Sequence, residues 1–228
     1  MRSTILGSLF TAQMLHAQTP MLKEISCVPQ KDAKASLIYL HGLDPEPTPR
    51  EELNHRQMVT ELAAKNKLNL FIPRSTILCK ERYCWPNNDP KLHKEVYDAI
   101  LIESKKCLGD AQPLILLGFS NGGFFSSKVA TYCYSGVAAV IASGSYGSLT
   151  DVDLKRIEPA KCPSIALTIG SGDLSYAKAK KYYADLKKAG YKVSFDSFPA
   201  KHELSRKVLQ SKLHELSTSL ANAKEPKK

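Results

Sequence analysis

The stretch Gly118-Phe119-Ser120-Asn121-Gly122-Gly123 predicts the fold class of this 228-residue chain more directly than any other part of it. It follows the apolar run Pro113–Leu117 and opens a second apolar stretch, Phe124–Ala130. This order indicates a strand, a sharp turn and a helix. Glycine is needed on both sides of the serine, because a side chain there would clash with the neighbouring strand or helix. The pattern is the G-x-S-x-G nucleophile elbow, which exposes the serine hydroxyl. A glycine-rich turn with an idle serine is the alternative.

Candidates for the rest of a catalytic triad follow Ser120 in the chain. Asp173 comes after an apolar run, Ser164–Ile169, and a glycine-rich turn. His202 lies in the loop after the strand-like run Tyr191–Phe198. In proteins that contain this elbow, the acid and the histidine follow the serine in this order, each after a strand, and Asp173 and His202 resemble that arrangement. We therefore predict Ser120 as nucleophile, His202 as general base and Asp173 as the carboxylate that orients the imidazole.

The other titratable residues are weaker candidates. Three histidines lie in polar helical segments, where we expect solvated side chains: His55, His93 and His214. Asp151 and Asp153 follow Thr150 and resemble acids at a helix start. Asp196 lies inside a predicted strand. Cys79 and Cys84 have poor spacing with His93 for zinc, so we expect no metal and no cofactor.

A serine nucleophile also needs an oxyanion hole made of two backbone N–H groups. We predict one of them at Asn121, where the helix after the serine begins and its dipole adds positive potential. The other is expected in the stretch His41-Gly42-Leu43-Asp44, which follows the predicted strand Ser36–Leu40. The glycine of this stretch lets the backbone approach the nucleophile, and Leu43 is the predicted donor. We interpret His41 as a structural residue that pins the turn.

The two motifs together, His41–Asp44 and Gly118–Gly123, resemble those of the α/β-hydrolase superfamily. They are most similar to its small carboxylesterase, phospholipase and acyl-thioesterase branch, with polyester depolymerases and feruloyl esterases as neighbours. The resemblance covers residues 35–218. It implies a serine hydrolase that cleaves a small-molecule or polymer-linked ester or thioester through an acyl-enzyme on Ser120. A serine peptidase or amidase on the same fold, or a non-catalytic binding protein on a hydrolase scaffold, stays open.

Apolar strand-like runs alternate with helical segments along the chain. Strands are predicted at residues 36–41, 68–72, 113–118, 137–142, 164–169 and 192–198. Helices are predicted at residues 50–65, 91–106, 121–134, 174–189 and 203–222. The alternation predicts an α/β fold with a doubly wound, mostly parallel sheet and helices on both faces. The first of these helices has an apolar stripe that we assign to the core: Leu53, Met58, Val59, Leu62 and Ala63.

The two ends of the chain differ from its middle. Residues 1–17 combine Arg2, a short apolar stretch and the small residue Ala17, which predicts a secretory signal peptide. An N-terminal helix packed on the body is the alternative. Residues 18–222 are predicted to form a single domain without a large lid, followed by a flexible basic tail at 223–228. No apolar run is long enough to span a bilayer.

Cysteine content agrees with a secreted or periplasmic location. The chain has six cysteines, an even number that fits three disulfides in an oxidising compartment. The short spacing of Cys79 and Cys84 predicts a disulfide between them. For the other four cysteines, the predicted fold allows these pairs: Cys27–Cys107 and Cys133–Cys162.

The loop Pro73–Pro90 follows a predicted strand and is longer than a plain connection. The resemblance implies that it lines the acyl pocket. Tyr83 and Trp85 lie in it beside the predicted disulfide, and we expect both at the substrate pocket. Alternatively, Trp85 anchors the loop to the core.

The chain carries a net charge of +10, with a sequence pI near 9.2. A basic exported protein is attracted electrostatically to an anionic envelope surface or to acidic substrates. The basic residues are spread along helices, and no nucleic-acid-binding module or basic stripe with interleaved aromatics is present. Nucleic acid is therefore not an expected partner.

Overall fold

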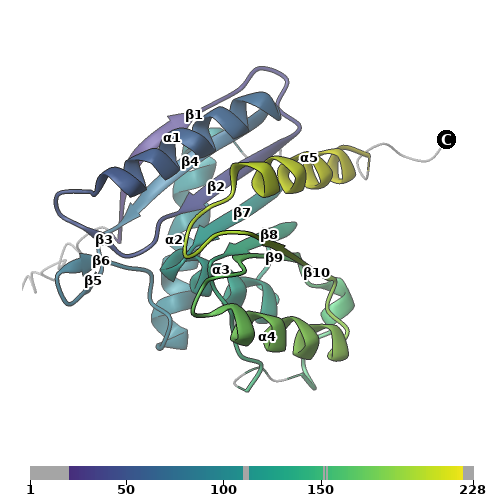
Figure 1. The fold of residues 1–228 in the computed structure, drawn as a ribbon. Helices are drawn as coiled ribbons and strands as arrows, with labels where there is room; N and C mark the ends of the chain where they lie inside the picture. The colour runs from purple at the N-terminus through teal and green to yellow at the C-terminus, as the bar shows by residue number, and fades with distance from the viewer. Residues whose placement is uncertain (1–20, 110–112, 151, 153, 223–228) are drawn as a thin grey trace, which may run out of the picture.

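A seven-stranded sheet with the strand order β1-β4-β2-β7-β8-β9-β10 forms the centre of the protein in a computed structural model (Figure 1). The structure describes residues 21–109, 113–150, 152 and 154–222, so the predicted signal peptide and basic tail lie outside the described residues. The strands are β1 (Leu22–Val28), β2 (Ala35–Leu40), β4 (Leu68–Ser75), β7 (Leu114–Phe119), β8 (Ala139–Ser143), β9 (Ser164–Gly170) and β10 (Val193–Phe198). Neighbouring strands from β4 to β10 are parallel, and β1 alone pairs antiparallel, with β4.

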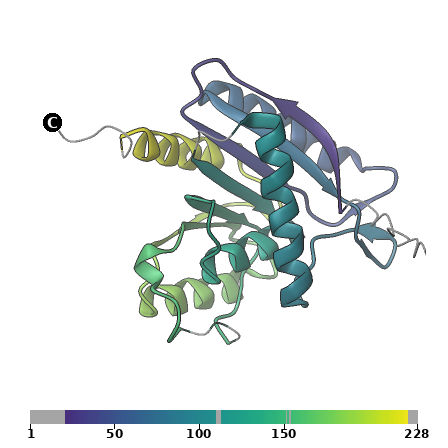
Figure 2. The same ribbon diagram turned by 180° about the vertical axis from the view of Figure 1, so that it is seen from behind.

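Helices cover both faces of the sheet, which confirms the predicted doubly wound α/β architecture. On one face lie α1 (Arg50–Lys65) and α5 (Arg206–Asn222), in front of the sheet in Figure 1. The other face packs against α2 (Pro90–Leu108), α3 (Asn121–Thr131) and α4 (Tyr176–Lys188), and α2 lies in front in Figure 2. A short 3₁₀ turn, η1 (Pro159–Lys161), precedes β9. The predicted strands and helices agree with these bounds to within three residues.

The central strands are apolar throughout because each face of the sheet is covered. In β2, Leu37 and Tyr39 pack under α1 and α5, while Ile38 and Leu40 pack under the helices of the opposite face. All six residues of β2 are buried. A strand buried on both faces needs a continuous apolar run, which is why the sequence marks these strands clearly.

The strand order places the candidate site. From β2 the chain first adds β4 on one side and then β7 on the other, so the order reverses between β2 and β7. Ligands of open parallel sheets bind beyond the carboxyl ends of the strands at such a switch point. The two predicted oxyanion segments follow β2 and β7, and therefore flank it.

Two parts of the sheet structure were not predicted. One is β1, the antiparallel edge strand. The other is a small three-stranded sheet, β3-β6-β5, built from β3 (Asp44–Pro45), β5 (Leu78–Cys79) and β6 (Arg82–Tyr83). This small sheet joins the segment after β2 to the loop after β4.

The predicted apolar stripe of α1 is wrong at its first position. Leu53 is 51 % exposed, and the buried positions of this half of the helix are Glu52 and His55. Glu52 is buried because its carboxylate accepts hydrogen bonds from Arg56 and Tyr39. His55 is buried because its ring packs edge-on against Phe119, with centroids 4.7 Å apart. His55 is 7 % exposed, so the expectation that it is solvated is also wrong.

His93 was likewise expected to be solvated, but its side chain is fully buried in α2. Its Nε2–H donates to the Phe125 carbonyl at 3.1 Å, and its ring packs on Phe125 with centroids 4.0 Å apart. Among the described residues Nδ1 has no hydrogen-bond partner. Burial lowers the pKa of His93 to about 4; the bond to Phe125 opposes this shift and the charge of Lys128 adds to it.

His93 should make the protein sensitive to acid. Its folded-state pKa of about 4 lies below its ordinary value of 6.5, so the unfolded chain binds more protons between these values and stability falls as the pH drops from 6.5 to 4. The full loss is roughly 3 kcal/mol. Urea unfolding at pH 7, 5 and 4 measures it. His93→Gln keeps a donor for the Phe125 carbonyl and does not titrate, so its stability should depend less on pH over this window; an equal pH dependence of both proteins would contradict the assignment.

Candidate active site

Ser120 lies on a strained turn between β7 and α3. Its φ is 50° and its ψ −113°, a backbone conformation that residues other than glycine rarely adopt. The flanking glycines make the turn possible. A Cβ added to Gly118 would lie 2.1 Å from the carbonyl oxygen of Gly122, and one added to Gly122 would lie 2.3 Å from that of Leu40. The clash predicted for side chains at these two positions is confirmed.

The structure brings the three predicted triad residues together in one hydrogen-bonded chain. His202 Nε2 lies 2.9 Å from Ser120 Oγ, and His202 Nδ1 lies 2.6 Å from Asp173 Oδ2. The ionised carboxylate can only accept, so Nδ1 carries a proton and Nε2 is free to accept the serine hydroxyl proton. Ser120 follows β7, Asp173 follows β9 and His202 follows β10.

Asp173 is held for this contact by its own turn. Its side chain is 3 % exposed, and the second carboxylate oxygen, Oδ1, accepts the Ser175 N–H at 2.7 Å. Of the competing acids, Asp196 lies in β10 and pairs with Lys212 at 3.2 Å. Asp151 and Asp153 lie outside the described residues.

The two predicted oxyanion segments meet beside Ser120. A Cβ added to Gly42 would lie 3.4 Å from Ser120 Cβ, so the backbone of this loop passes close to the nucleophile. Within the part of the chain that the structure describes, the N–H groups of Leu43 and Asn121 donate to no acceptor. Two unpaired donors next to a serine, one of them at a helix N-terminus, can stabilise a developing oxyanion.

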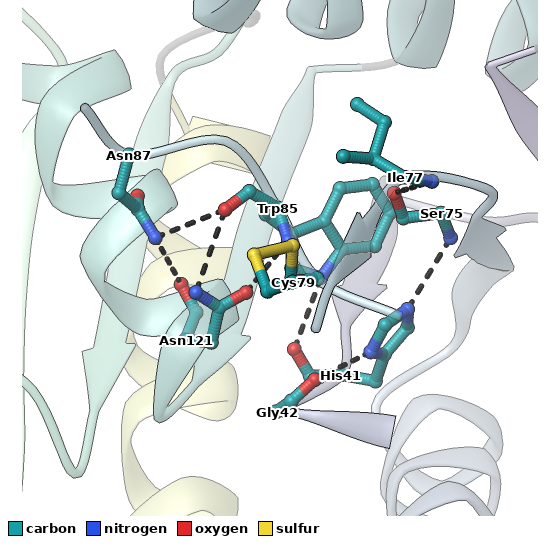
Figure 3. Close-up of a disulfide and its surroundings, with 9 residues drawn as sticks. His41, Gly42, Ser75, Ile77, Cys79, Trp85, Asn87 and Asn121 are labelled. Atoms are coloured by element: carbon teal, nitrogen blue, oxygen red, sulfur yellow. Dashed lines mark hydrogen bonds between the residues drawn. A yellow bond between two sulfur atoms is a disulfide. The ribbon is translucent and has the colours of Figure 1, made fainter. Parts of the chain in front are cut away.

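His41 connects the oxyanion loop to β4. The Ser75 N–H donates to His41 Nε2 at 3.3 Å, so the ring proton resides on Nδ1, which donates to the Gly42 carbonyl at 2.6 Å (Figure 3). Burial lowers the pKa of His41, although the bond to Gly42 opposes the shift. A neutral, fully buried imidazole with both nitrogens paired fits the structural role interpreted from the sequence.

A network of charged side chains holds Asp44, the residue that follows Leu43 in the oxyanion loop. Its side chain is fully buried, and one oxygen pairs with Arg56 of α1 at 2.7 Å and with Arg74 of β4 at 3.1 Å. Arg56 also binds Glu52 at 3.0 Å, and Glu52 accepts the hydroxyl of Tyr39 at 3.1 Å. These contacts tie the loop to a helix and a strand, and they explain why α1 buries polar side chains at its N-terminal end.

A pocket of about 320 Å³ opens next to the triad. Its lining combines the nucleophile and base with the oxyanion loop and the start of α1: Gly42, Leu43, Pro49, Glu51, Glu52, His55, Arg82, Phe119, Ser120 and His202. A larger cavity of about 660 Å³ lies between β10 and α5 and contains no triad residue. The smaller pocket is therefore the candidate substrate site.

The polar wall of this pocket was not predicted. The i, i+3 spacing of Glu52 and His55 could have indicated a polar helix face turned towards the site. Arg82 reaches the pocket from within the loop between Cys79 and Cys84, where its place in a short closed loop is the corresponding signal.

Tyr83 and Trp85 were expected to line the substrate pocket, but the structure places both of them elsewhere. Trp85 is fully buried among the core residues of the sheet. The Tyr83 ring packs under the Arg74 guanidinium, 4.3 Å from it. In the described part of the chain neither borders the pocket next to Ser120. The placement of Trp85 corresponds to the alternative that it anchors the loop, and our expectation for the pocket is corrected accordingly.

The cysteines form the three predicted disulfides: Cys27–Cys107, Cys79–Cys84 and Cys133–Cys162. Over the described residues, no three His, Cys, Asp or Glu side chains are grouped as metal ligands would be. None of the described helices has the length and apolar character needed to cross a membrane.

Solved structures of known proteins share this architecture. No protein-family profile and no curated protein sequence matches the chain. The esterase PE8 superposes with a TM-score of 0.64 at 19 % identity, over 86 % of this chain and 98 % of its own. A carboxylesterase from Mesorhizobium loti gives 0.63 at 19 % identity over 80 % and 90 %. The Bacillus cereus carboxylesterase gives 0.61 at 16 % identity over 89 % and 95 %. The chain therefore has the α/β-hydrolase fold, as its two motifs predicted.

Proposed function

We propose that this protein is an exported serine hydrolase that cleaves a carboxylic ester or thioester. The observation that carries the proposal is the unbroken chain Ser120 Oγ, His202 and Asp173, with contacts of 2.9 and 2.6 Å. It lies beside two unpaired backbone donors and a pocket. The esterase and carboxylesterase names of the structural neighbours support the same class of reaction.

The proposed reaction follows from the proton positions. His202 Nε2 accepts the Ser120 proton while Oγ attacks the carbonyl carbon, and the carbonyl oxygen becomes an oxyanion facing the N–H groups of Leu43 and Asn121. Collapse breaks the ester bond, and the imidazolium gives its proton to the leaving alcohol or thiol. Water then attacks the acyl-enzyme with His202 as base, which releases the acid and restores the Ser120 hydroxyl.

The pocket favours compact acyl groups with some polar character. About 320 Å³ is near the lower end of the range for small-molecule sites. Its lining includes the buried His55 and the charged Arg82 beside the apolar Leu43 and Phe119. A long alkyl chain would lie against polar groups without bonding to them, which is unfavourable.

Export is part of the proposal and is supported by the disulfides. All six cysteines are paired, as expected for a protein from an oxidising compartment.

A panel of p-nitrophenyl esters from acetate to dodecanoate tests the function, together with matched p-nitroanilides and a fluorophosphonate probe. We expect the probe to label Ser120, and kcat/KM to be highest for acetate to butyrate and to fall at least tenfold by the dodecanoate. A higher kcat/KM for anilides would identify an amidase instead. An unlabelled protein without turnover would identify a binding protein on a hydrolase scaffold.

A further inference from the structure

The two donors of the proposed oxyanion hole come from segments that are far apart in the chain. Leu43 follows β2, and Asn121 begins α3 after β7. Both N–H groups must stay fixed to within about 0.5 Å to stabilise an oxyanion without reorganisation. One backbone bond joins the segments directly, from the Gly122 N–H to the His41 carbonyl at 3.1 Å.

Trp85 contacts both donor segments (Figure 3). Its indole Nε1–H donates to the same His41 carbonyl at 3.0 Å. Its backbone N–H donates to Asn121 Oδ1 at 2.6 Å, and Asn121 Nδ2 donates back to the Trp85 carbonyl at 3.4 Å. The Asn121 side chain thus pairs with the Trp85 backbone as a neighbouring strand would.

Asn87 completes this contact. Its Nδ2 donates to the Trp85 carbonyl at 3.1 Å and to the Asn121 carbonyl at 3.3 Å. Lys128 of α3 donates to the Asn87 carbonyl. The segment Trp85–Asn87 is therefore bound to the start of α3 at several points.

The Cys79–Cys84 disulfide holds the residue directly before Trp85. Cys84 is fully buried, and its N–H donates to the Ile77 carbonyl at 2.9 Å. Within the closed loop, Arg82 and Tyr83 pair in β6 with Pro45 and Asp44, the residues that follow Leu43. The loop therefore pairs with the segment that follows Leu43, and its last residue, Cys84, directly precedes Trp85.

We propose that Trp85, locked by the Cys79–Cys84 disulfide, is a positioning residue that joins the two halves of the oxyanion hole. The proposal rests on the serine hydrolase function proposed above. The small size of the loop closed by Cys79–Cys84 favours this local positioning role over a role in stabilising the whole fold. Closing five residues contributes about 2 kcal/mol on the chain-entropy model, against about 4.5 kcal/mol for the 80-residue loop of Cys27–Cys107.

We call the contacts by which Trp85 joins the two donor segments the clamp, and three variants weaken it at different points. Trp85→Phe removes the indole donor, Asn121→Ala removes the side-chain pairing with the Trp85 backbone, and Cys79→Ala/Cys84→Ala opens the disulfide-closed loop. Each should lower kcat and kcat/KM for p-nitrophenyl acetate together, by about 10- to 100-fold, because an oxyanion contact acts in the transition state. KM should stay within about twofold.

Phe125→Leu is the matched control. Phe125 is fully buried and packs on the Trp85 ring, 5.8 Å between centroids, and this change removes no hydrogen bond of the clamp. It should lower thermal stability as the clamp variants do while kcat stays near the wild-type value. An equal loss of kcat in this control would reduce Trp85 to a packing residue.

A second readout does not need turnover. Trp85 is the one tryptophan of the chain, so the emission maximum of wild type, Asn121→Ala and the double cysteine variant reports its burial. Hydrogen exchange at the Gly122 amide reports the contact between the two segments. We expect a red shift in the Asn121→Ala and double cysteine variants, and faster exchange at the Gly122 amide in all three clamp variants. Unchanged exchange and emission, or unchanged kcat in an active enzyme, would overturn the clamp. If the wild type hydrolyses no ester, the proposed function fails and these two signals alone decide.

Discussion

Replacing Ser120 by alanine is expected to abolish ester turnover and fluorophosphonate labelling. In the proposed mechanism, the hydrogen-bonded chain through His202 and Asp173 activates this hydroxyl, and losing such a nucleophile costs on the order of 10⁴- to 10⁶-fold in kcat. Alanine keeps the φ of 50° at this position, so the melting temperature should change by no more than about 2 °C.

Ser120→Gly provides the matched control for the fold. It should be equally inactive, but glycine adopts a positive φ without strain. Relief of strain should make this variant more stable than the wild type by about 1 kcal/mol, which urea unfolding measures. A Ser120→Ala protein that turns over esters within tenfold of wild type would exclude Ser120 as the nucleophile.

Asp173→Asn should lower kcat by about 10³- to 10⁴-fold while leaving KM nearly unchanged. An asparagine amide can donate to His202 Nδ1, and the ring then places its proton on Nε2, which faces Ser120 Oγ at 2.9 Å. The base is lost although the geometry is kept. Stopped-flow burst measurements with p-nitrophenyl acetate should show that acylation itself is slowed.

Asp196→Asn tests the choice of acid. Asp196 lies inside β10, the strand that precedes His202, but it pairs with Lys212 instead of a histidine. The substitution should change kcat less than twofold. A large effect of Asp196→Asn together with a small one of Asp173→Asn would reverse the assignment of the carboxylate.

The parts of the fold that sequence predicts well are those buried on both sides. The central strands read as continuous apolar runs because helices cover both faces, and the elbow glycines are required by contacts as short as 2.1 Å. The edge strand β1 was missed because pairing with β4 alone, rather than an apolar pattern, makes it a strand. The two-residue strands β3, β5 and β6 have no pattern long enough to detect.

Sequence predicted which residues at strand ends lie close together, but it did not predict the burial of side chains whose environment depends on tertiary contacts. Ser120, Asp173 and His202 converge because parallel strands end at one edge. No local pattern states that His55 and His93 are buried, since that depends on which loop or aromatic side chain faces the helix. For Trp85, a core position and a pocket position leave the same sequence signature in a loop.

The Cys27–Cys107 disulfide has a consequence for colloidal behaviour. It links β1 covalently to α2. Within the described residues, β1 is the only strand that pairs with the outer edge of β4. If reduction lets β1 detach, the N–H and C=O groups of β4 around Phe71 lose their partners, and this buried, apolar strand becomes an open template for intermolecular strand pairing. In a reducing environment, we then expect aggregation to occur before the contacts among Ser120, His202 and Asp173 are lost.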